Sequence, residues 1–478
     1  MLFKEKIKSS VIIILIINLL FLTTQMWFYN SGTTLKNSFI EYVHSLPIIE
    51  TLFPREPEYS ISKENLSKPR KFLINDGSLW MAYYNTDIGF SPINERTKEL
   101  ITGFLNGDVT ATKKIDSATW EAGLESLSIY VEYPVAFSPE MFSRIMGANE
   151  SSVPEEIDAF REFIVIPSTN DSDVCVLARD NKTPDNMYAY ILSDKYTLPA
   201  SDLEVYTSAE DSYYQPAFST GLELAEGSNV SLDPLVLFSD SQPTTKVLQP
   251  QNLISESSNV KLLESFGFNA EMKPYKDSDG AVKYIGNYSN ATIYPDGIFE
   301  YTVVSDEKGI PLDESGNSYN VLNASIDFSE QIWKCVSNEQ LSILVSSNLS
   351  GYDSSKPYTF KFDYYCNGRP VKIDLPANYG HEQMNCAIEI TVKDGKLISY
   401  RQYMRNYISA DDYVLSDNFV TALDYFVQTL EENVKTDVVV EDIYIGYTDS
   451  GASTDLYATW LAQADNGIIY RYTKPDTN

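Results

Sequence analysis

Histidine and cysteine, the side chains that most often carry out catalysis or bind metals, are scarce in this chain. The 478 residues include only two histidines and four cysteines: His44, His381, Cys175, Cys335, Cys366 and Cys386. No C-x-x-C, H-E-x-x-H, G-x-S-x-G or glycine-rich phosphate-binding loop occurs. The chain therefore has too few histidines for a histidine-rich metal site and few candidates for a histidine-based catalytic triad. We predict no catalytic residue, no metal and no cofactor.

Acidic residues are abundant, with 67 Asp and Glu against 36 Lys and Arg, so the net charge is −31. The stretch Asp277-Ser278-Asp279-Gly280 superficially resembles a calcium loop, but it lacks the third acidic ligand, the glycine at position 6 and the glutamate at position 12. It is better explained as a hairpin turn. Spacing singles out no pair of carboxylates for glycoside hydrolysis. Such an acidic chain is not expected to bind nucleic acid through its overall field.

The most distinctive segment lies at the N-terminus, where no charged residue occurs between Val11 and Phe28. About 18 helical residues span roughly 27 Å, close to the thickness of a hydrocarbon core. The run lacks the small-residue cleavage site of a signal peptide, and Trp27 and Tyr29 are typical interfacial anchors. We predict a cytoplasmic tail over residues 1–10, a transmembrane helix over residues 11–29 in contact with the lipid bilayer, and an extracellular C-terminal bulk. The alternative is a cleaved signal, which would leave a secreted soluble binding protein.

One stripe of this helix carries the polar residues. Ile14, Asn18, Phe21, Leu22 and Gln25 follow the spacing i, i+4, i+7, i+8 and i+11. An amide in hydrocarbon is costly unless it finds a partner, and interhelical amide hydrogen bonds contribute around 0.6–2 kcal/mol each. We predict that this stripe is a partner-binding face. The alternative is a tolerated single asparagine, with the Gln25 side chain hydrated at the headgroups.

The remaining residues predict an α+β ectodomain of several domains, with mainly antiparallel sheets and packed helices. The expected parts are a stalk over 30–69, an N-terminal α+β domain over 70–240, a linker over 241–255, a central hairpin-and-helix module over 256–355 and a C-terminal hairpin-and-helix module over 356–478. The two modules share a plan of two hairpins followed by a helix. Cys366 and Cys386 fall in neighbouring strand-like segments, where both a disulfide and unpaired thiols remain open.

Local patterns place the elements within these parts. Strands are expected on both sides of Asn75-Asp76-Gly77, and a half-buried strand is expected over 127–133. Helices are expected over 93–105, 328–346 and 416–434, and another begins after the capping pair Ser138-Pro139. Four dipeptides predict type I′ hairpin turns: Asp279-Gly280, Asp296-Gly297, Asn367-Gly368 and Asp394-Gly395.

The anchor and the last 220 residues resemble the YycH family. The resemblance rests on four stretches: Leu22-Thr23 with Trp27 and Tyr29, the tyrosine-rich run from Tyr275 to Tyr301 with Ile293-Tyr294-Pro295-Asp296-Gly297, Ile445-Gly446-Tyr447, and Leu456-Tyr457-Ala458-Thr459-Trp460 before Asn466-Gly467. Residues 70–240 match that family only in general plan. The closing part is also similar to the related YycI proteins.

The resemblance implies a function in signal transduction. YycH-family proteins are single-pass accessory proteins of Gram-positive bacteria that modulate a two-component sensor histidine kinase, WalK or YycG, which controls cell-wall metabolism. By this resemblance, the partners are a WalK/YycG-like kinase and a YycI-like accessory protein, and the protein is not an enzyme. The alternative is a membrane-anchored extracellular enzyme or binding protein acting on cell-wall polymers. An enzyme is expected to show a cleft with converging carboxylates or a metal.

Overall fold

The computed structural model describes residues 60–473, except 78, 86, 88, 149–152, 169–172, 208–213, 221–223, 225–227, 240–242, 270 and 466. Backbone contacts divide the chain into Met1–Ser60 and Ile61–Asn478, and nearly all described residues belong to the second unit. The predicted cytoplasmic tail, the transmembrane helix and residues 30–59 of the stalk lie outside the described residues.

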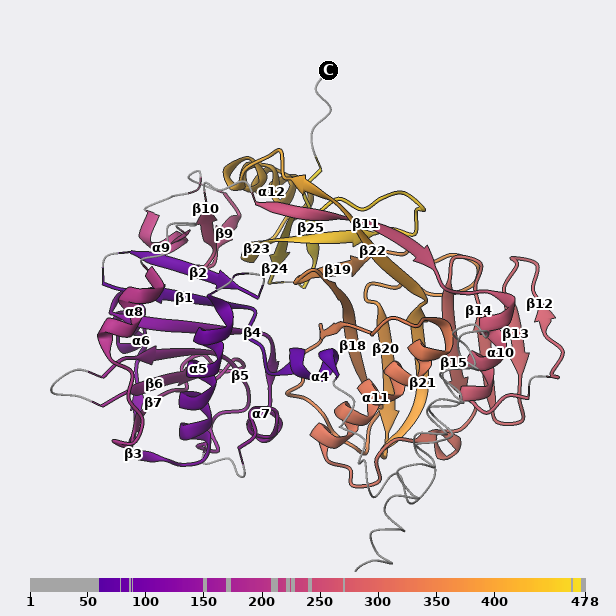
Figure 1. Cartoon of the computed structure of the whole chain (residues 1–478), viewed down its shortest axis with the longest axis horizontal. Coiled ribbons are helices and arrows are strands. Elements are labelled where there is room, and N and C mark those ends of the chain that lie inside the picture. Colours follow the sequence, from indigo (N-terminus) through magenta and orange to yellow (C-terminus); the bar gives the residue numbers. More distant parts are fainter. Residues whose placement is uncertain are drawn as a thin grey trace, which may run out of the picture. The chain divides into compact units, whose positions relative to one another are not determined.

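The N-terminal part of the second unit contains an antiparallel sheet of seven strands, drawn in indigo and violet in Figure 1. The order across the sheet is β2-β1-β4-β5-β6-β7-β3. The strands are β1 (Lys71–Asn75), β2 (Trp80–Tyr84), β3 (Val109–Ile115), β4 (Ser128–Phe137), β5 (Phe160–Ile166), β6 (Cys175–Arg179) and β7 (Met187–Leu192). The hairpin predicted around Asn75-Asp76-Gly77 is confirmed, with Lys71 opposite Tyr84.

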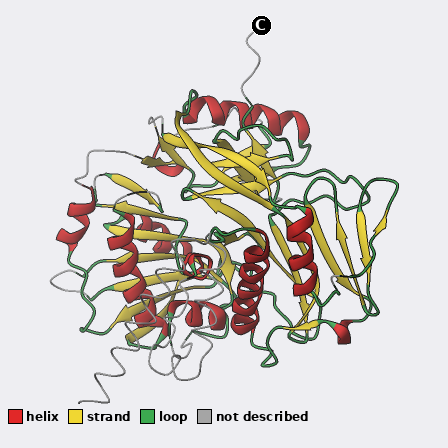
Figure 2. Ribbon diagram, turned by 45° about the vertical axis from the view of Figure 1, so that its right-hand side comes forward, coloured by secondary structure: helices red, strands yellow, loops and turns green. Residues whose placement is uncertain are grey.

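Helices cover this sheet, as Figure 2 shows in red. The predicted helix over 93–105 is α5 (Phe90–Leu105), and Ser138 caps α7 (Pro139–Met146) by accepting a hydrogen bond from the Met141 N–H. Both contribute to a core that contains Phe104 and Phe163, whereas α6 (Ser117–Glu125) places Trp120 in a second cluster. The prediction of a half-buried strand over 127–133 is wrong in one respect. β4 is buried on both faces, because it lies inside the sheet and both faces are covered.

The rest of the chain builds a second, fourteen-stranded sheet. Its strands are β9 (Val230–Leu232), β12 (Tyr275–Lys276), β13 (Val282–Ile285), β14 (Ser289–Ile293), β15 (Ile298–Val303), β16 (Ile310–Pro311), β17 (Ile343–Val345), β18 (Tyr358–Cys366), β19 (Arg369–Ile373), β20 (Ile388–Lys393), β21 (Lys396–Tyr403), β23 (Val438–Asp449), β24 (Thr459–Ala464) and β25 (Ile469–Arg471). β15 pairs with β21, with Tyr301 opposite Tyr400. The central and C-terminal hairpins therefore share one sheet.

Helices α10 (Glu256–Ser265), α11 (Ser318–Val336) and α12 (Phe419–Asn433) accompany this second sheet (Figure 1). The helix predicted over 416–434 is α12, which Asn418 caps by accepting a hydrogen bond from the Thr421 N–H. The helix predicted over 328–346 is displaced. α11 begins ten residues earlier than predicted, at Ser318, because the Asn317 side chain caps it by accepting hydrogen bonds from two backbone N–H groups. Residues 343–345, expected in the helix, form strand β17, which pairs with β18.

The structure also differs from the expected stalk and linker. Residues 244–252, expected as linker, form β11 (Thr244–Asn252), which pairs with β22 (Arg405–Val414) in a two-stranded ribbon. Pro250 is accommodated there because β11 has a strand on one side only within this ribbon. At the end of the expected stalk, α4 (Ile61–Leu66) packs near β17, and the Asn65 side chain donates a hydrogen bond to the Ile343 carbonyl.

The glycine-containing turns fall into two types. At Asn367-Gly368 and Asp394-Gly395 both residues have positive φ, as a type I′ turn requires. At Asp279-Gly280 and Asp296-Gly297 only the glycine does. There the loops are longer: the Gly297 N–H donates to the Tyr294 carbonyl, and the Tyr294 N–H donates to the Ile298 carbonyl. This pattern needs a single left-handed residue, so the type I′ prediction is wrong for these two turns.

We predict that Gly395→Ala destabilises the fold more than Gly77→Ala. Both glycines have positive φ, but a Cβ at Gly395 meets the Asp313 carbonyl oxygen at 1.8 Å, whereas a Cβ at Gly77 meets nothing within 4 Å. The left-handed conformation alone costs roughly 1–2 kcal/mol, and crowding raises the expected loss at Gly395 to roughly 2–5 kcal/mol. Urea unfolding of both variants measures the difference. Equal losses would contradict the role assigned to the Asp313 contact.

Candidate functional site

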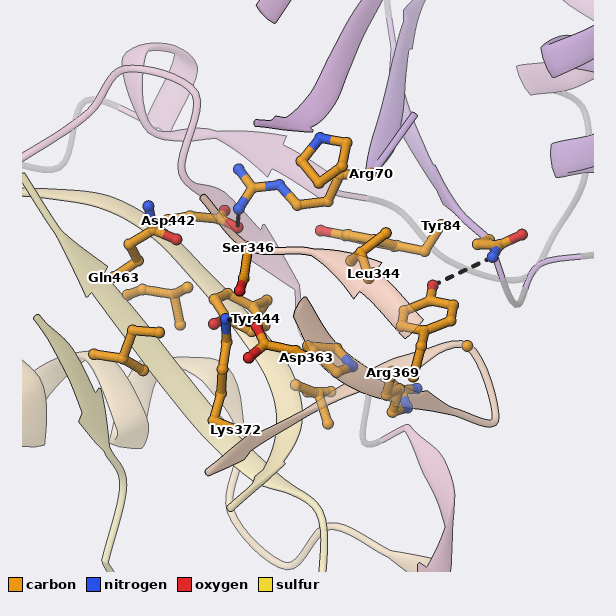
Figure 3. A pocket seen from close by; sticks show the side chains of 18 of the residues that line it. Arg70, Tyr84, Leu344, Ser346, Asp363, Arg369, Lys372, Asp442, Tyr444 and Gln463 are labelled. Atoms are coloured by element: carbon orange, nitrogen blue, oxygen red, sulfur yellow. Dashed lines mark hydrogen bonds and ion pairs between the residues drawn. The ribbon is translucent and has the colours of Figure 1, made fainter. Parts of the chain in front are cut away.

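A cleft of about 940 Å³ is lined by residues of both sheets (Figure 3). One wall comes from β2, β4 and β5, and the other comes from β17, β18, β19, β23 and β24. Its lining includes six cationic and six acidic side chains: Lys68, Arg70, Arg161, Lys246, Arg369, Lys372, Asp87, Asp363, Asp412, Glu441, Asp442 and Asp465. The cleft is therefore electrically balanced, although the whole chain carries a net charge of −31.

A network of buried ion pairs joins the two walls. The Lys71 side chain on β1 is only 1% exposed, and its Nζ lies 3.1 Å from Glu132 Oε2 and 3.3 Å from Asp442 Oδ1. Arg70 pairs with both carboxylates, and Arg161 Nη2 lies 3.0 Å from Glu132 Oε1. Glu132 stands opposite Lys71 on the neighbouring strand β4, whereas Asp442 belongs to β23 of the other sheet. Asp442 therefore ties the two sheets together through charge.

The network holds its members ionised. Burial opposes the ionisation of Glu132, but the charges of Arg70, Lys71 and Arg161 hold its pKa well below the ordinary value of 4.5. Burial would lower the pKa of Lys71, but Asp442 and Glu132 raise it above the ordinary value of 10.5. Stability from Glu132 is thus lost as pH falls below 4.5, and stability from Lys71 is lost as pH rises above 10.5. Between these values Glu132 and Lys71 both stay charged.

A second group of charges lies on the hairpin formed by β18 and β19. Lys372 Nζ lies 2.6 Å from Asp363 Oδ2, while Asp363 Oδ1 is buried with no hydrogen-bond donor in the described part of the chain. Burial raises the pKa of Asp363, and the Lys372 charge opposes that rise. Arg369 begins β19 and lines the cleft. Across the cleft, the Asn85 side chain donates a 3.2 Å hydrogen bond to the Tyr365 hydroxyl, which links the two walls (Figure 3).

A different kind of surface occurs at the β12–β14 end of the large sheet. Among the large hydrophobic side chains of the described residues, the four most exposed are Tyr275, Ile285, Tyr288 and Val304, at 57–70% exposure. We call these four residues the apolar end. The Val304 N–H donates to the Tyr288 carbonyl, so these two residues are neighbours. A groove of about 540 Å³ adjoins them and is lined by Phe266, Phe268, Met272, Ile285, Tyr288, Tyr301, Ile310 and Pro311, among others. Such concentrated exposed apolar area is typical of a protein interaction surface.

His381 and the four cysteines are the histidine and cysteine side chains that the structure describes. The buried His381 ring contacts Asp296 Oδ2 through Nε2 at 2.6 Å and the Glu382 carbonyl through Nδ1 at 2.7 Å. All four cysteines are free thiols, so Cys366 and Cys386 are not bridged. Burial raises the pKa of Cys366 to about 12, which keeps it protonated at neutral pH. The described residues contain no group of three His, Cys, Asp or Glu side chains placed to hold a metal ion.

The predicted partner-binding stripe, Ile14, Asn18, Phe21, Leu22 and Gln25, lies outside the described residues, as do the anchors Trp27 and Tyr29. Within the residues that the structure does describe, none of the helices is long and apolar enough to cross a membrane. The transmembrane helix stays a prediction.

Sequence reasoning missed both the cleft and the apolar end. One signal for the cleft is present in the sequence: Arg70 and Lys71 are consecutive basic residues at the start of the apolar strand β1, where a buried cation demands a partner. The sequence signal for the apolar end is weaker, because the strand-and-turn pattern around Ile285 and Tyr288 predicts buried side chains as readily as exposed ones.

Comparison with known proteins establishes the fold. No family model and no curated protein matches the sequence. Among solved structures, the chain is similar to YycH from Bacillus subtilis, with a TM-score of 0.54 and 13% identity over 87% of this chain and 100% of that chain. An uncharacterized protein from Eubacterium rectale aligns with a TM-score of 0.30 and 10% identity over 53% of this chain and 86% of that one. The chain therefore has a YycH-like fold, as the sequence resemblance indicates.

We predict that Asp442→Asn costs roughly 3–5 kcal/mol of unfolding free energy, because it leaves the buried Lys71 and its neighbouring arginines with one carboxylate. The matched control is Asp412→Asn, since Asp412 is 66% exposed and pairs with Lys246 at 2.7 Å. An exposed pair contributes about 0–1 kcal/mol. Urea unfolding at neutral pH measures both. A loss for Asp442→Asn no larger than the control's would show that the network does not hold the two sheets.

Proposed function

We propose that this chain is a non-enzymatic, single-pass membrane regulator that modulates a two-component sensor histidine kinase controlling cell-wall metabolism. The observation that carries the proposal is the YycH-like fold, which extends over 87% of this chain and all of the YycH structure. It agrees with the family resemblance that the sequence shows in the anchor and in residues 256–478. The proposed partners are a WalK/YycG-like kinase and a YycI-like accessory protein.

The proposed membrane contact is the stripe of the helix over residues 11–29. An asparagine in hydrocarbon gains most by hydrogen bonding to a neighbouring helix, and Asn18 is near the middle of the span. We assign the kinase contact to this stripe. In the proposed ectodomain, the two hairpin-and-helix modules are joined through the pairing of β15 with β21.

The proposed extracellular contact is the apolar end, and the occupant we assign to it is the YycI-like accessory protein. A second copy of this chain is disfavoured because two bodies of net charge −31 repel each other. The exposed side chains of Ile285, Tyr288 and Val304 lie beside a groove that an apolar side chain of the partner can enter. Lys308 lies 4.8 Å from the Tyr288 ring, which adds a cation to the rim.

The proposed mechanism is a shift of population. The regulator binds one signalling conformation of the kinase more tightly than the other, and the shift in the kinase equilibrium cannot exceed that difference in binding free energy. No covalent chemistry is required of the regulator.

The alternative function is a membrane-anchored extracellular enzyme or binding protein, and of these two the cleft supports the binding protein. The two buried carboxylates of the cleft do not suit hydrolysis: Asp442 is held by two cations, and one oxygen of Asp363 contacts Lys372 while the other is buried. A glycoside hydrolase needs a carboxylic acid and a carboxylate that both reach the substrate. The environments of Asp442 and Asp363 therefore favour binding over hydrolysis at this part of the cleft.

The test is co-purification from native cells of the full-length chain and of a chain lacking residues 1–29. We expect the kinase to accompany only the full-length chain, and Asn18→Leu to reduce its recovery. Leu22→Ala, on the stripe, is expected to reduce recovery more than the matched Leu20→Ala off the stripe. If the native N-terminus begins near residue 30 and no kinase is recovered with either chain, the regulator proposal fails.

We predict that Ile285→Asp lowers recovery of the accessory protein at least tenfold, because a charge must then be buried in the interface and about 1.4 kcal/mol suffices for that factor. Val414→Asp is the matched control, since Val414 is 54% exposed on β22, away from the apolar end. Quantitative immunoblotting after membrane extraction measures both. Equal recovery with the two variants would remove the apolar end from the proposal.

A further inference from the structure

We propose that the cleft is a binding site for an acid sugar, a small ring-shaped ligand that carries one carboxylate and several hydroxyl groups. The cleft volume of about 940 Å³ lies in the upper range of ordinary small-molecule sites, which span roughly 300–1,000 Å³. This site is distinct from the proposed membrane stripe and the apolar end, and it does not depend on the identity of the kinase.

The Lys71 network places buried cations behind the inner walls of the cleft. Arg70, Lys71 and Arg161 surround Glu132 and Asp442, and the carboxylates Glu162 and Asp233 also act on these cations. The Nε–H groups of both arginines have no acceptor in the described part of the chain. These groups are buried, so the network itself offers a ligand no direct contact.

Arg369 is the direct anion contact that the geometry offers. It lines the cleft, it is half-buried, and it forms no ion pair with any carboxylate of the described residues. Its neighbour on the same strand, Lys372, is already occupied by Asp363 at 2.6 Å. A guanidinium group binds a carboxylate through two parallel hydrogen bonds, which gives Arg369 a specific preference for this group. Figure 3 shows Asp363 between Arg369 and Lys372.

The remaining lining suits the neutral body of a sugar. Tyr84, Tyr365 and Tyr444 provide aromatic surface and hydroxyl groups, and Tyr365 is fixed in place by its hydrogen bond from Asn85. Hydroxyl and amide side chains also line the cleft: Ser346, Thr244, Asn181, Asn348, Asn367 and Gln463. The last three already bond to the Ala136 N–H, Ser409 and Glu441, so Ser346, Thr244 and Asn181 are the partners best placed to donate to and accept from sugar hydroxyls. A sugar ring packs against aromatic faces.

The charges at the rim limit the ligand to one negative charge. Asp87 and Asp465 line the cleft at exposed positions and repel a nearby anion. For a dianion such as inorganic phosphate near neutral pH, this repulsion is about twice that for a monoanion, while only the Arg369 guanidinium is available to bind it. A monoanion attached to an uncharged ring gains the Arg369 contact at the smallest cost.

The experiment uses the full-length chain in detergent micelles and isothermal titration calorimetry with three probes. N-acetylmuramic acid carries a carboxylate, N-acetylglucosamine is the same ring without the group that bears the carboxylate, and inorganic phosphate is an anion without a ring. We expect N-acetylmuramic acid to bind at least tenfold more tightly than either of the other two. Equal binding of both sugars, equal binding of phosphate, or no binding of N-acetylmuramic acid at millimolar concentration overturns the proposal.

Variants locate the site. Arg369→Gln is expected to weaken N-acetylmuramic acid binding at least tenfold and to leave the weak binding of N-acetylglucosamine unchanged. Arg144→Ala, which removes an arginine of α7 outside the cleft, is the control and is expected to bind as the native chain does. Native affinity in Arg369→Gln overturns the assignment of the carboxylate to this residue. The comparison of the three probes on the native chain remains decisive even if Arg369→Gln does not fold.

Discussion

The burial of Lys71 is the constraint on which the arrangement of the two sheets depends. An ammonium group that is almost wholly removed from water must be paired, because an isolated buried charge costs several kcal/mol. Glu132 comes from the adjacent strand β4, but the second carboxylate, Asp442, comes from a strand 371 residues further along the chain. The buried charge of Lys71 in the seven-stranded sheet is therefore paired with both carboxylates only when Asp442 on β23 of the large sheet contacts it.

The cleft is a consequence of this pairing. Because the junction is made by charged side chains, water or polar ligands can reach the space beside them, which a purely apolar junction would close. At the border of the cleft, the same junction is closed by packing: Phe137 of β4 forms a β-bridge with Leu349, and the main hydrophobic core continues from one sheet into the other. The cleft and the apolar end also share the fourteen-stranded sheet through β15 and β21. A ligand in the cleft influences a partner at the apolar end only if this sheet has two arrangements of different affinity.

What the sequence predicted was mostly local. The Asn75-Asp76-Gly77 hairpin, the Ser138 cap and the Asn367-Gly368 turn depend on residues within a few positions of each other, and all three are confirmed. Helix α11 was misplaced because its start depends on the Asn317 cap, while the apolar residues after Val336 belong to β17 and pair with β18. The cleft was not predictable in this way, since nothing near Lys71 in the chain identifies Asp442 as its partner.

An acidic chain that binds an anion is physically consistent, because the two effects act over different distances. At physiological salt, charges farther than about 8 Å are largely screened, so most of the net charge of −31 does not reach a ligand inside the cleft. The ligand meets Arg369 and the rim carboxylates Asp87 and Asp465. The lining as a whole carries as many cations as carboxylates, so affinity rests on the geometry of one guanidinium and on hydrogen bonds to the ring. A second negative charge on a ligand would have no second unpaired arginine to bind and would be repelled by the rim carboxylates. The cleft is therefore selective for a single carboxylate.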